Sequence, residues 1–316
     1  MFLKAVNNIK SSEYLLINSA KQNILTMTTD KSNPILLILH GGPGSPDRPL
    51  VYKYNRDLAK YFTVICWDQR GCGLSYCKDR LSVAMLINDL NSLVDILCKK
   101  YNQKKVVISG HSWGAYLGLK YSSMYPDKIY AYIGTGQGVS SNDEIEKYNF
   151  CLRRATDLKE SKNVEKLLEI KAPVNGNYAS DNVQSKQFVS NLVHRYGGYI
   201  HANSNINMKK YVSIYIKHYG INIFKVIKGI KHSLACLRQE MLDNENTGIL
   251  KLNIPIKIIQ GEWDYICPNA TVKQWFDNLQ APKKEFAVIK NAAHMVNFEQ
   301  PEDWNKEVKE FIMKSY

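Results

Sequence analysis

The chain alternates between short apolar runs and longer segments that are apolar on one side only. Apolar runs at 35–39, 62–67 and 105–109 each end at a loop that contains glycine. A run of this length is typical of a strand that is buried on both faces of a parallel sheet. Residues 82–100 instead carry leucines at intervals of three and four, which predicts an amphipathic helix.

The same alternation predicts further elements on both sides of these segments. Residues 14–18 and 23–28 alternate as two short strands joined by a few residues, which predicts a β-hairpin. Further strands are predicted at 129–134, 255–260 and 285–290, and further helices at 47–60, 115–124, 270–279 and 301–313. Strands that alternate with helices in this way indicate an α/β fold with a doubly wound, mostly parallel sheet.

Residues 137–250 interrupt the alternation. This segment has helical patterns, is rich in Lys, Asn, Tyr and His, and contains no convincing buried strand. We therefore predict a core formed by residues 1–136 and 251–316, with residues 137–250 inserted as a helical cap.

Composition and charge exclude several classes of partner. The formal net charge is +13, but no run of five basic residues occurs, and we expect no nucleic-acid partner. No stretch approaches the roughly 18 apolar residues of a spanning helix, and the N-terminal MFLKAVNNIK lacks the apolar run of a signal peptide. We expect no membrane partner, and the sequence leaves the oligomeric state open.

The seven cysteines show no disulfide or zinc pattern. Their number is odd and no CxxC spacing occurs, which fits a reducing compartment. We therefore expect a cytoplasmic protein with no metal and no cofactor.

The sequence GHSWG at 110–114 stands between the strand predicted at 105–109 and the helix predicted at 115–124. In this context G-x-S-x-G is the pattern of a nucleophile elbow, where a serine lies on a sharp strand-to-helix turn. Side chains flanking such a turn would collide, which explains the two glycines. The positive end of the following helix favours an oxyanion beside Ser112.

A nucleophilic serine needs a base, and the base needs an orienting carboxylate. Asp264 and His294 each follow one of the last two predicted strands, in the chain order that this architecture requires. Taken singly, Asp264 fits an ordinary turn, with Glu262 as a rival carboxylate, and His294 fits a surface histidine. Together with Ser112 they predict a catalytic triad. His111 is not expected to be the base, because neighbours at an elbow point apart.

An acyl-transfer site also needs two backbone N–H groups that point at the substrate's carbonyl oxygen. Trp113, the residue after the serine, is predicted to supply one. The other is expected from HGGPG at 40–44, where Pro43 has no N–H and three glycines remain. Of these we favour Gly42.

Four motifs together resemble the proline iminopeptidase-like branch of the α/β-hydrolases, peptidase family S33. They are HGGPG at 40–44, DQRGCGLS at 68–75, GHSWG at 110–114 and GEWDYICP at 261–268. The resemblance implies an α/β-hydrolase fold with the cap inserted after the strand that follows the nucleophile helix. It also implies Ser112 as nucleophile, Asp264 as acid and His294 as base, with 68–71 as a structural loop. A serine at the elbow argues against the dehalogenases and epoxide hydrolases, relatives that place an aspartate there.

The resemblance is weaker in the cap. Proline iminopeptidases carry a GGSWG elbow and a cap stretch of the type Trp-x-x-Trp-Glu, whose glutamate binds the substrate's amino group. Here residues 137–250 contain no tryptophan. Candidate substrate contacts are Gln137, just past a predicted strand, and the cap residues Glu144 and Glu240. Gln137 also fits a turn, and both glutamates also fit exposed helix positions.

The cap is instead rich in tyrosine and histidine, with His194 and Tyr199 among them. Several of these residues recur at intervals of three and four, which is typical of a packed helix face. If some of them face Ser112, they line an aromatic acyl pocket with hydrogen-bonding tips.

These features predict a serine hydrolase that works through an acyl-enzyme on a small molecule or a short peptide. The first hypothesis is an aminopeptidase that removes a small N-terminal residue such as proline. An esterase, lactonase or amidase acting on a small acyl substrate is the alternative. A non-catalytic binding protein with this fold is disfavoured, because all three triad candidates are present.

Overall fold

A twisted eight-stranded sheet runs through the computed structural model, which describes residues 9–139, 143–179, 182–202, 204, 207–243 and 245–315. The spatial order is β1-β2-β4-β3-β5-β6-β7-β8, and all pairs from β4 to β8 are parallel. The strands are β1 (Ile9–Ile17), β2 (Ala20–Thr28), β3 (Ile35–Leu39), β4 (Thr63–Trp67), β5 (Val106–His111), β6 (Ile129–Thr135), β7 (Ile256–Gly261) and β8 (Lys284–Ile289). The predicted mostly parallel, doubly wound sheet is confirmed.

The antiparallel hairpin of β1 and β2 is tighter than its sequence indicates. The turn consists of Asn18 and Ser19 alone, both with positive φ (44° and 66°), and Ile17 pairs directly with Ala20. Two consecutive left-handed residues match the twist of a hairpin, and Asn adopts this conformation readily. The predicted connection therefore contributes residues to β2.

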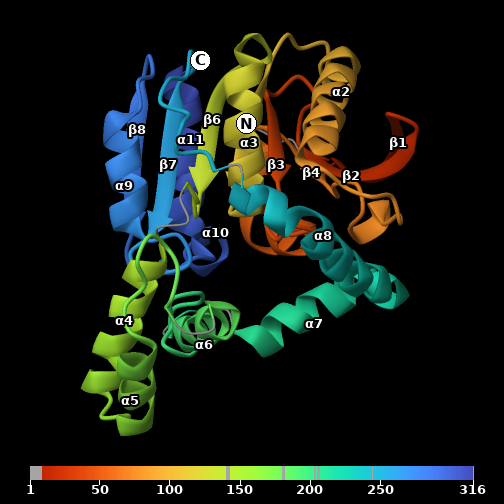
Figure 1. The fold of residues 1–316 in the computed structure, drawn as a ribbon. Coiled ribbons are helices and arrows are strands. Elements are labelled where there is room, and N and C mark those ends of the chain that lie inside the picture. Colours follow the sequence, from red (N-terminus) through yellow and green to blue (C-terminus); the bar gives the residue numbers. More distant parts are fainter. Residues whose placement is uncertain are drawn as a thin grey trace, which may run out of the picture.

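Helices cover both faces of the sheet. One face carries α2 (Val83–Tyr101), α3 (Trp113–Met124) and α9 (Asn269–Asn278), whose apolar side chains join the same buried cluster. The other face carries α10 (Val296–Glu299) and α11 (Pro301–Ser315), and α11 lies behind β7 in Figure 1. The leucines that predicted α2 are among its buried residues, because their spacing keeps them on one side of the helix.

The helical segment predicted at 47–60 forms, but as three short pieces of different helix type and not as one regular α-helix. The chain there forms α1 (Arg48–Leu50), a π turn at Val51–Asn55 and a 3₁₀ turn at Arg56–Lys60. The side-chain amide of Asn55 donates to the carbonyl of Asn297 (2.9 Å) and to the side chain of Asn305 (3.0 Å). These contacts tie the junction of the two turns to α10 and α11, a tertiary constraint that overrides the helical period.

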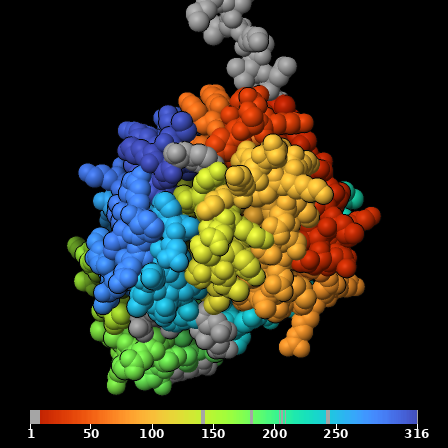
Figure 2. Space-filling view, turned by 90° about the horizontal axis from the view of Figure 1, so that it is seen from above, coloured from red at the N-terminus to blue at the C-terminus, as the bar shows by residue number. Residues whose placement is uncertain are grey.

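Between β6 and β7 the described elements are helices, with isolated β-bridges from Val174 to Asn177 and from Lys251 to Gln280. We call α4–α8 the cap helices: α4 (Asp143–Asp157), α5 (Ser161–Ile170), α6 (Asn182–Arg195), α7 (Met208–Tyr219) and α8 (Ile223–Asp243). In Figure 1 the arrowhead of β7 points toward α4, and α4 to α7 lie beyond that end of the sheet. Figure 2 looks from the opposite end, where N-terminal (red) and C-terminal (blue) core segments flank the yellow middle of the core. None of the described helices combines the length and the apolar character that a membrane crossing requires.

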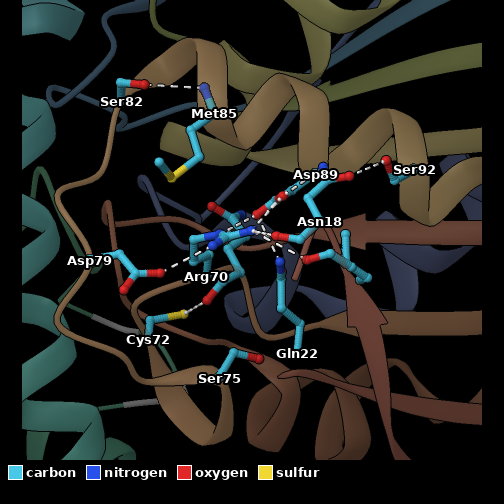
Figure 3. A network of polar contacts seen from close by, with 12 residues as sticks. Asn18, Gln22, Arg70, Cys72, Ser75, Asp79, Ser82, Met85, Asp89 and Ser92 are labelled. Carbon is cyan, nitrogen blue, oxygen red and sulfur yellow. Dashed lines mark hydrogen bonds and ion pairs between the residues drawn. The ribbon is translucent and has the colours of Figure 1, made fainter. Parts of the chain in front are cut away.

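A buried ionic network anchors the loop after β4. The guanidinium of Arg70 donates to both carboxylate oxygens of Asp89 in α2 (2.7 and 2.9 Å). Asp89 also accepts from the side chains of Asn18 (2.9 Å) and Gln22 (2.7 Å), so one carboxylate joins the hairpin, the loop and α2 (Figure 3). Asp89 is fully buried, and every described bond to it comes from a charged or amide donor.

We expect Asp89→Ala to lower the free energy of unfolding by about 3–5 kcal/mol, because it leaves the buried Arg70 without its main counter-ion. Asp95→Ala on the same helix removes an exposed partner of Lys128 and is expected to cost less than about 1 kcal/mol. Urea unfolding of the two variants measures the difference. Equal losses would contradict a structural role for this network.

Candidate active site

Ser112 lies on a strained turn between β5 and α3. Its backbone has φ 53° and ψ −115°, which a non-glycine residue adopts only where the surroundings enforce it. A Cβ on Gly114 would lie 2.0 Å from the carbonyl oxygen of Leu39, and one on Gly110 would lie 2.3 Å from that of Gly114. The two flanking glycines therefore allow β3, β5 and α3 to meet closely at the serine.

Asp264 and His294 form a buried hydrogen-bonded pair. Nδ1 of His294 lies 2.9 Å from Oδ2 of Asp264, and both side chains are almost wholly buried. The other carboxylate oxygen accepts the backbone N–H groups of Ile266 (2.9 Å) and Cys267 (2.8 Å). Because a carboxylate accepts, Nδ1 is the donor in this bond, and the other ring nitrogen, Nε2, is not used by the pair.

The rival carboxylate, Glu262, has a different contact. It is exposed and accepts the backbone N–H of Asn291 (3.2 Å). The carboxylate bonded to the imidazole is therefore that of Asp264.

The residues at the end of β6 contact both Ser112 and His294. The N–H of Ser112 donates to the carbonyl of Thr135 (2.9 Å). At the next residue, Gly136, an added Cβ would lie 2.9 Å from Cε1 of His294. His111 lies beside both, because its Nε2 donates to the carbonyl of His294 (3.0 Å) and the two rings are 5.1 Å apart.

Burial lowers the pKa of His111 to about 3, with a further contribution from the neighbouring His294. His111 is therefore neutral at physiological pH. Its Nε2 binds the backbone carbonyl of His294 and so holds the loop that carries this histidine.

Glu299 and the cap hold the loop of His294. One oxygen of Glu299 accepts the N–H groups of Ala293 (3.0 Å) and Met295 (3.1 Å), on either side of the histidine. Its other oxygen accepts from the N–H of His201 in the cap (2.7 Å). The N–H of His294 donates to the carbonyl of Tyr199 (3.1 Å), also in the cap.

The loop after β7 that carries Asp264, here called the acid loop, also contacts the cap. The N–H of Tyr265 donates to the carbonyl of Gly198 (3.1 Å).

Sequence reasoning missed Glu299. An acid that follows four mostly apolar residues carries no recognisable motif of its own.

The segments that carry the predicted oxyanion donors lie beside the serine. An added Cβ on Gly41 would be 3.5 Å from Cβ of Ser112, so the HGGPG loop passes directly over it. Gly42 has φ 122° and is exposed, and Trp113 is the first residue of α3. Within the part of the chain that the structure describes, the backbone N–H groups of Gly42 and Trp113 donate to no other residue.

Comparison with known proteins gives the family of the chain. The family model described as "Serine aminopeptidase, S33" matches residues 34–301. The chain belongs to this S33 family. A probable aminopeptidase of Bacillus subtilis, YbaC, is 31% identical over 300 residues, which cover 91% of this chain and 91% of YbaC. A proline iminopeptidase of Saccharolobus solfataricus is 25% identical over 298 residues, covering 90% of this chain and 86% of that protein.

Solved structures confirm the α/β-hydrolase fold of this S33 chain. VinJ superposes with a TM-score of 0.70 at 17% identity and covers 97% of this chain and 99% of its own. The proline iminopeptidase of Mycobacterium smegmatis superposes with a TM-score of 0.66 at 17% identity, with coverages of 96% and 98%.

Two of the three residues predicted to contact the substrate, Gln137 and Glu240, are bonded to other parts of the protein. The amide of Gln137 is buried and bonded to the hydroxyl of Tyr132 (2.5 Å) and the carbonyl of Gly138 (3.1 Å). The carboxylate of Glu240 accepts the N–H of Val83 at the start of α2 (3.0 Å). Both groups are thus engaged in structural contacts within the protein.

Glu144 lies at the start of α4, paired with Lys147 (3.0 Å). Its neighbour Asp143 is buried, and burial raises the pKa of Asp143 to about 7, with a small contribution from Asp264. This end of α4 therefore lies beside the acid loop.

Two aromatic cap residues lie close to the histidine. The ring of Tyr199 is 5.8 Å from that of His294, and His194 stacks on Tyr199 at 4.5 Å. Burial and the nearby His294 lower the pKa of His194. These two aromatic side chains of the cap therefore form a stack that lies next to His294.

We expect Gly114→Ala to lower the free energy of unfolding by about 3 kcal/mol or more, because the new methyl group collides with the backbone of β3. Gly248→Ala is the control: its added Cβ would have no atom within 4 Å. This control is expected to change stability by less than about 1 kcal/mol. Thermal unfolding of both variants measures the difference, and a stable Gly114→Ala would contradict the packing described for the elbow.

Two buried histidines make stability pH-dependent. Burial lowers the pKa of His40 to about 4 and that of His111 to about 3, whereas the unfolded chain titrates near 6.5. Their contribution is therefore complete above pH 6.5 and is lost as the pH falls toward 4. From pH 7.5 to 5 we expect a loss of about 2 kcal/mol per histidine. Urea unfolding should show a smaller acid loss for His111→Gln, and an identical pH slope would refute this assignment.

Proposed function

We propose that the protein is a serine hydrolase that works through an acyl-enzyme, with Ser112, His294 and Asp264 as its triad. The observation that carries the proposal is the buried hydrogen bond between Asp264 and Nδ1 of His294, at the edge of the sheet where the strained Ser112 turn lies. Membership of the S33 family supports the same reaction class.

In the proposed reaction Oγ of Ser112 attacks the substrate's carbonyl carbon and Nε2 of His294 takes its proton. Asp264 keeps the proton of the imidazole on Nδ1 and stabilises the imidazolium that forms. The backbone N–H groups of Gly42 and Trp113 bind the oxyanion. His294 then gives its proton to the leaving group, and water releases the acyl group by the same steps.

For the substrate we propose a short peptide or amino-acid amide with a small N-terminal residue. The support is the likeness to the probable aminopeptidase and to the proline iminopeptidases. The alternative, an esterase, lactonase or amidase, is favoured by the absence of tryptophan from the cap.

A free amino group needs a carboxylate partner away from bulk water. Of the predicted contacts, Glu144 is the one whose position supports this role. Its carboxylate is only partly exposed, and its neighbour Asp143, whose pKa is raised by burial, lies close enough to Asp264 for that carboxylate to raise the pKa of Asp143 further. In our proposal the substrate's ammonium takes the place of Lys147 beside Glu144.

Hydrolysis of prolyl- and alanyl-naphthylamide, compared with N-acetylated forms and with a neutral p-nitrophenyl ester, tests the reaction. We expect Ser112→Ala and Asp264→Asn to lower kcat by about 10⁴-fold. Glu262→Gln, the neighbouring carboxylate, is the control and is expected to keep the wild-type kcat. Activity on the ester with none on either free-amine amide would reject the aminopeptidase and support the alternative. An inactive wild type, or an active Ser112→Ala, would reject the hydrolase.

For substrates with a free amino group we expect Glu144→Gln to raise KM about 10-fold or more, because it removes a charge-assisted hydrogen bond. KM for the neutral ester is expected to stay unchanged. Glu146→Gln, on the same helix, serves as the matched control. A KM that rises equally for both substrate classes would contradict a contact between Glu144 and the amino group.

A further inference from the structure

The side chain of Gln69 forms hydrogen bonds to both chain segments that carry the predicted oxyanion donors. Its side-chain oxygen accepts the indole N–H of Trp113 (2.9 Å). Its side-chain nitrogen donates to the carbonyl of His40 (3.4 Å). Because an indole only donates and a carbonyl only accepts, these partners fix which way the amide faces.

The backbone of Gln69 sets the proton position on His40. Its N–H donates to Nε2 of His40 (3.2 Å), while Nδ1 of the same ring lies 2.8 Å from the carbonyl oxygen of Gly41. A backbone N–H cannot accept and a carbonyl cannot donate, so the ring proton is on Nδ1. Burial lowers the pKa of His40 to about 4, which keeps the ring in this neutral form.

With its proton on Nδ1, His40 donates to the carbonyl of Gly41, and this bond helps to fix the direction of the Gly42 N–H. The carbonyl of Gly41 and the N–H of Gly42 belong to one planar trans peptide, in which they point in opposite directions. Nδ1–H of His40 and the N–H of Ser45 (3.3 Å) both hold that carbonyl. The N–H on the other side of the plane is thereby held in one orientation.

Gln69 itself is held firmly. It is buried, and the thiol of Cys72 donates to its carbonyl (3.1 Å). The next residue, Arg70, is fixed by its ion pair with Asp89 (Figure 3). Gln69 is therefore held at its own carbonyl and is followed by a residue whose side chain is also fixed.

We propose that Gln69 is a positioning residue of the oxyanion hole. Its backbone N–H orients the Gly42 N–H through the tautomer of His40. Its side chain bonds both to His40 and to Trp113 and so holds the loop 40–44 at a fixed position relative to Trp113. The proposal rests on the proposed function, since it concerns the stabilisation of a tetrahedral anion at Ser112. Preorganised donors act because they need no rearrangement when the charge develops.

Gln69→Met tests the proposal, with Gln22→Met as matched control. Gln22 is also buried and also accepts an indole N–H, that of Trp67 (2.8 Å), but it lies on β2 in the ionic network. The measurements are kcat and KM for a p-nitrophenyl ester, affinity for a boronic acid that forms a tetrahedral adduct, and the urea midpoint.

For Gln69→Met we expect kcat to fall about 10- to 100-fold, somewhat less than for loss of a whole donor, while KM changes less than about 3-fold. Affinity for the boronic acid is expected to fall with kcat. Gln22→Met is expected to lower the urea midpoint and to leave kcat unchanged. Trp113→Phe, which removes the indole donor from the other side, is expected to lower kcat as well, and the double variant less than additively.

A Gln69→Met protein that keeps the wild-type kcat and boronic-acid affinity would overturn the proposal and leave the proposed function intact. Equal losses of kcat in Gln69→Met and Gln22→Met would also overturn it, because the effect would then follow from stability. If Gln69→Met does not fold, Trp113→Phe decides: an unchanged kcat overturns the proposal, and a lower kcat at an unchanged urea midpoint supports it. A wild type with no ester hydrolysis and no boronic-acid binding would reject the proposed function itself.

Discussion

The buried hydrogen bond between Asp264 and His294 is the contact on which the rest of the site depends. A carboxylate in this position loses its hydration, and the loss is offset by two backbone N–H groups and the imidazole. The bond also joins the loops after β7 and β8, so it requires both strands to end at the same edge. The cap contributes directly, since Tyr199 and His201 bind the histidine loop and its support, Glu299. Changes in the cap can therefore reach the proposed base through the backbone.

The positions of Ser112, Asp264 and His294 in the fold could be predicted because parallel strands constrain them. Each residue follows a strand that is apolar enough to recognise, and the carboxyl ends of parallel strands meet at one edge. The glycines at 110 and 114 were equally informative, since their Cβ positions are filled by neighbouring backbone. Asp264 was chosen over its rival Glu262 from the chain order and the family resemblance, and in the structure it is the carboxylate of Asp264 that is bonded to the imidazole.

Other features depend on contacts between residues distant in the sequence. The broken helix at 48–60 is tied to residues near 300, and Glu299 acquires its role only where three backbone N–H groups converge. Glu240 lies in the cap sequence yet caps a core helix. The cap helices have apolar faces that fit several packings, so their sequence does not specify which side chains meet Ser112. His194 and Tyr199 were foreseen only as members of a larger aromatic group.

Covalent labelling tests the central claim most directly. The protein is incubated with a fluorophosphonate, which reacts with a serine only when a base and an oxyanion hole activate it, and the adduct is located by peptide mass spectrometry. The account predicts a single adduct on Ser112 in the wild type and none in a folded His294→Ala variant. A wild type that remains unlabelled, or an adduct on another serine, would contradict it.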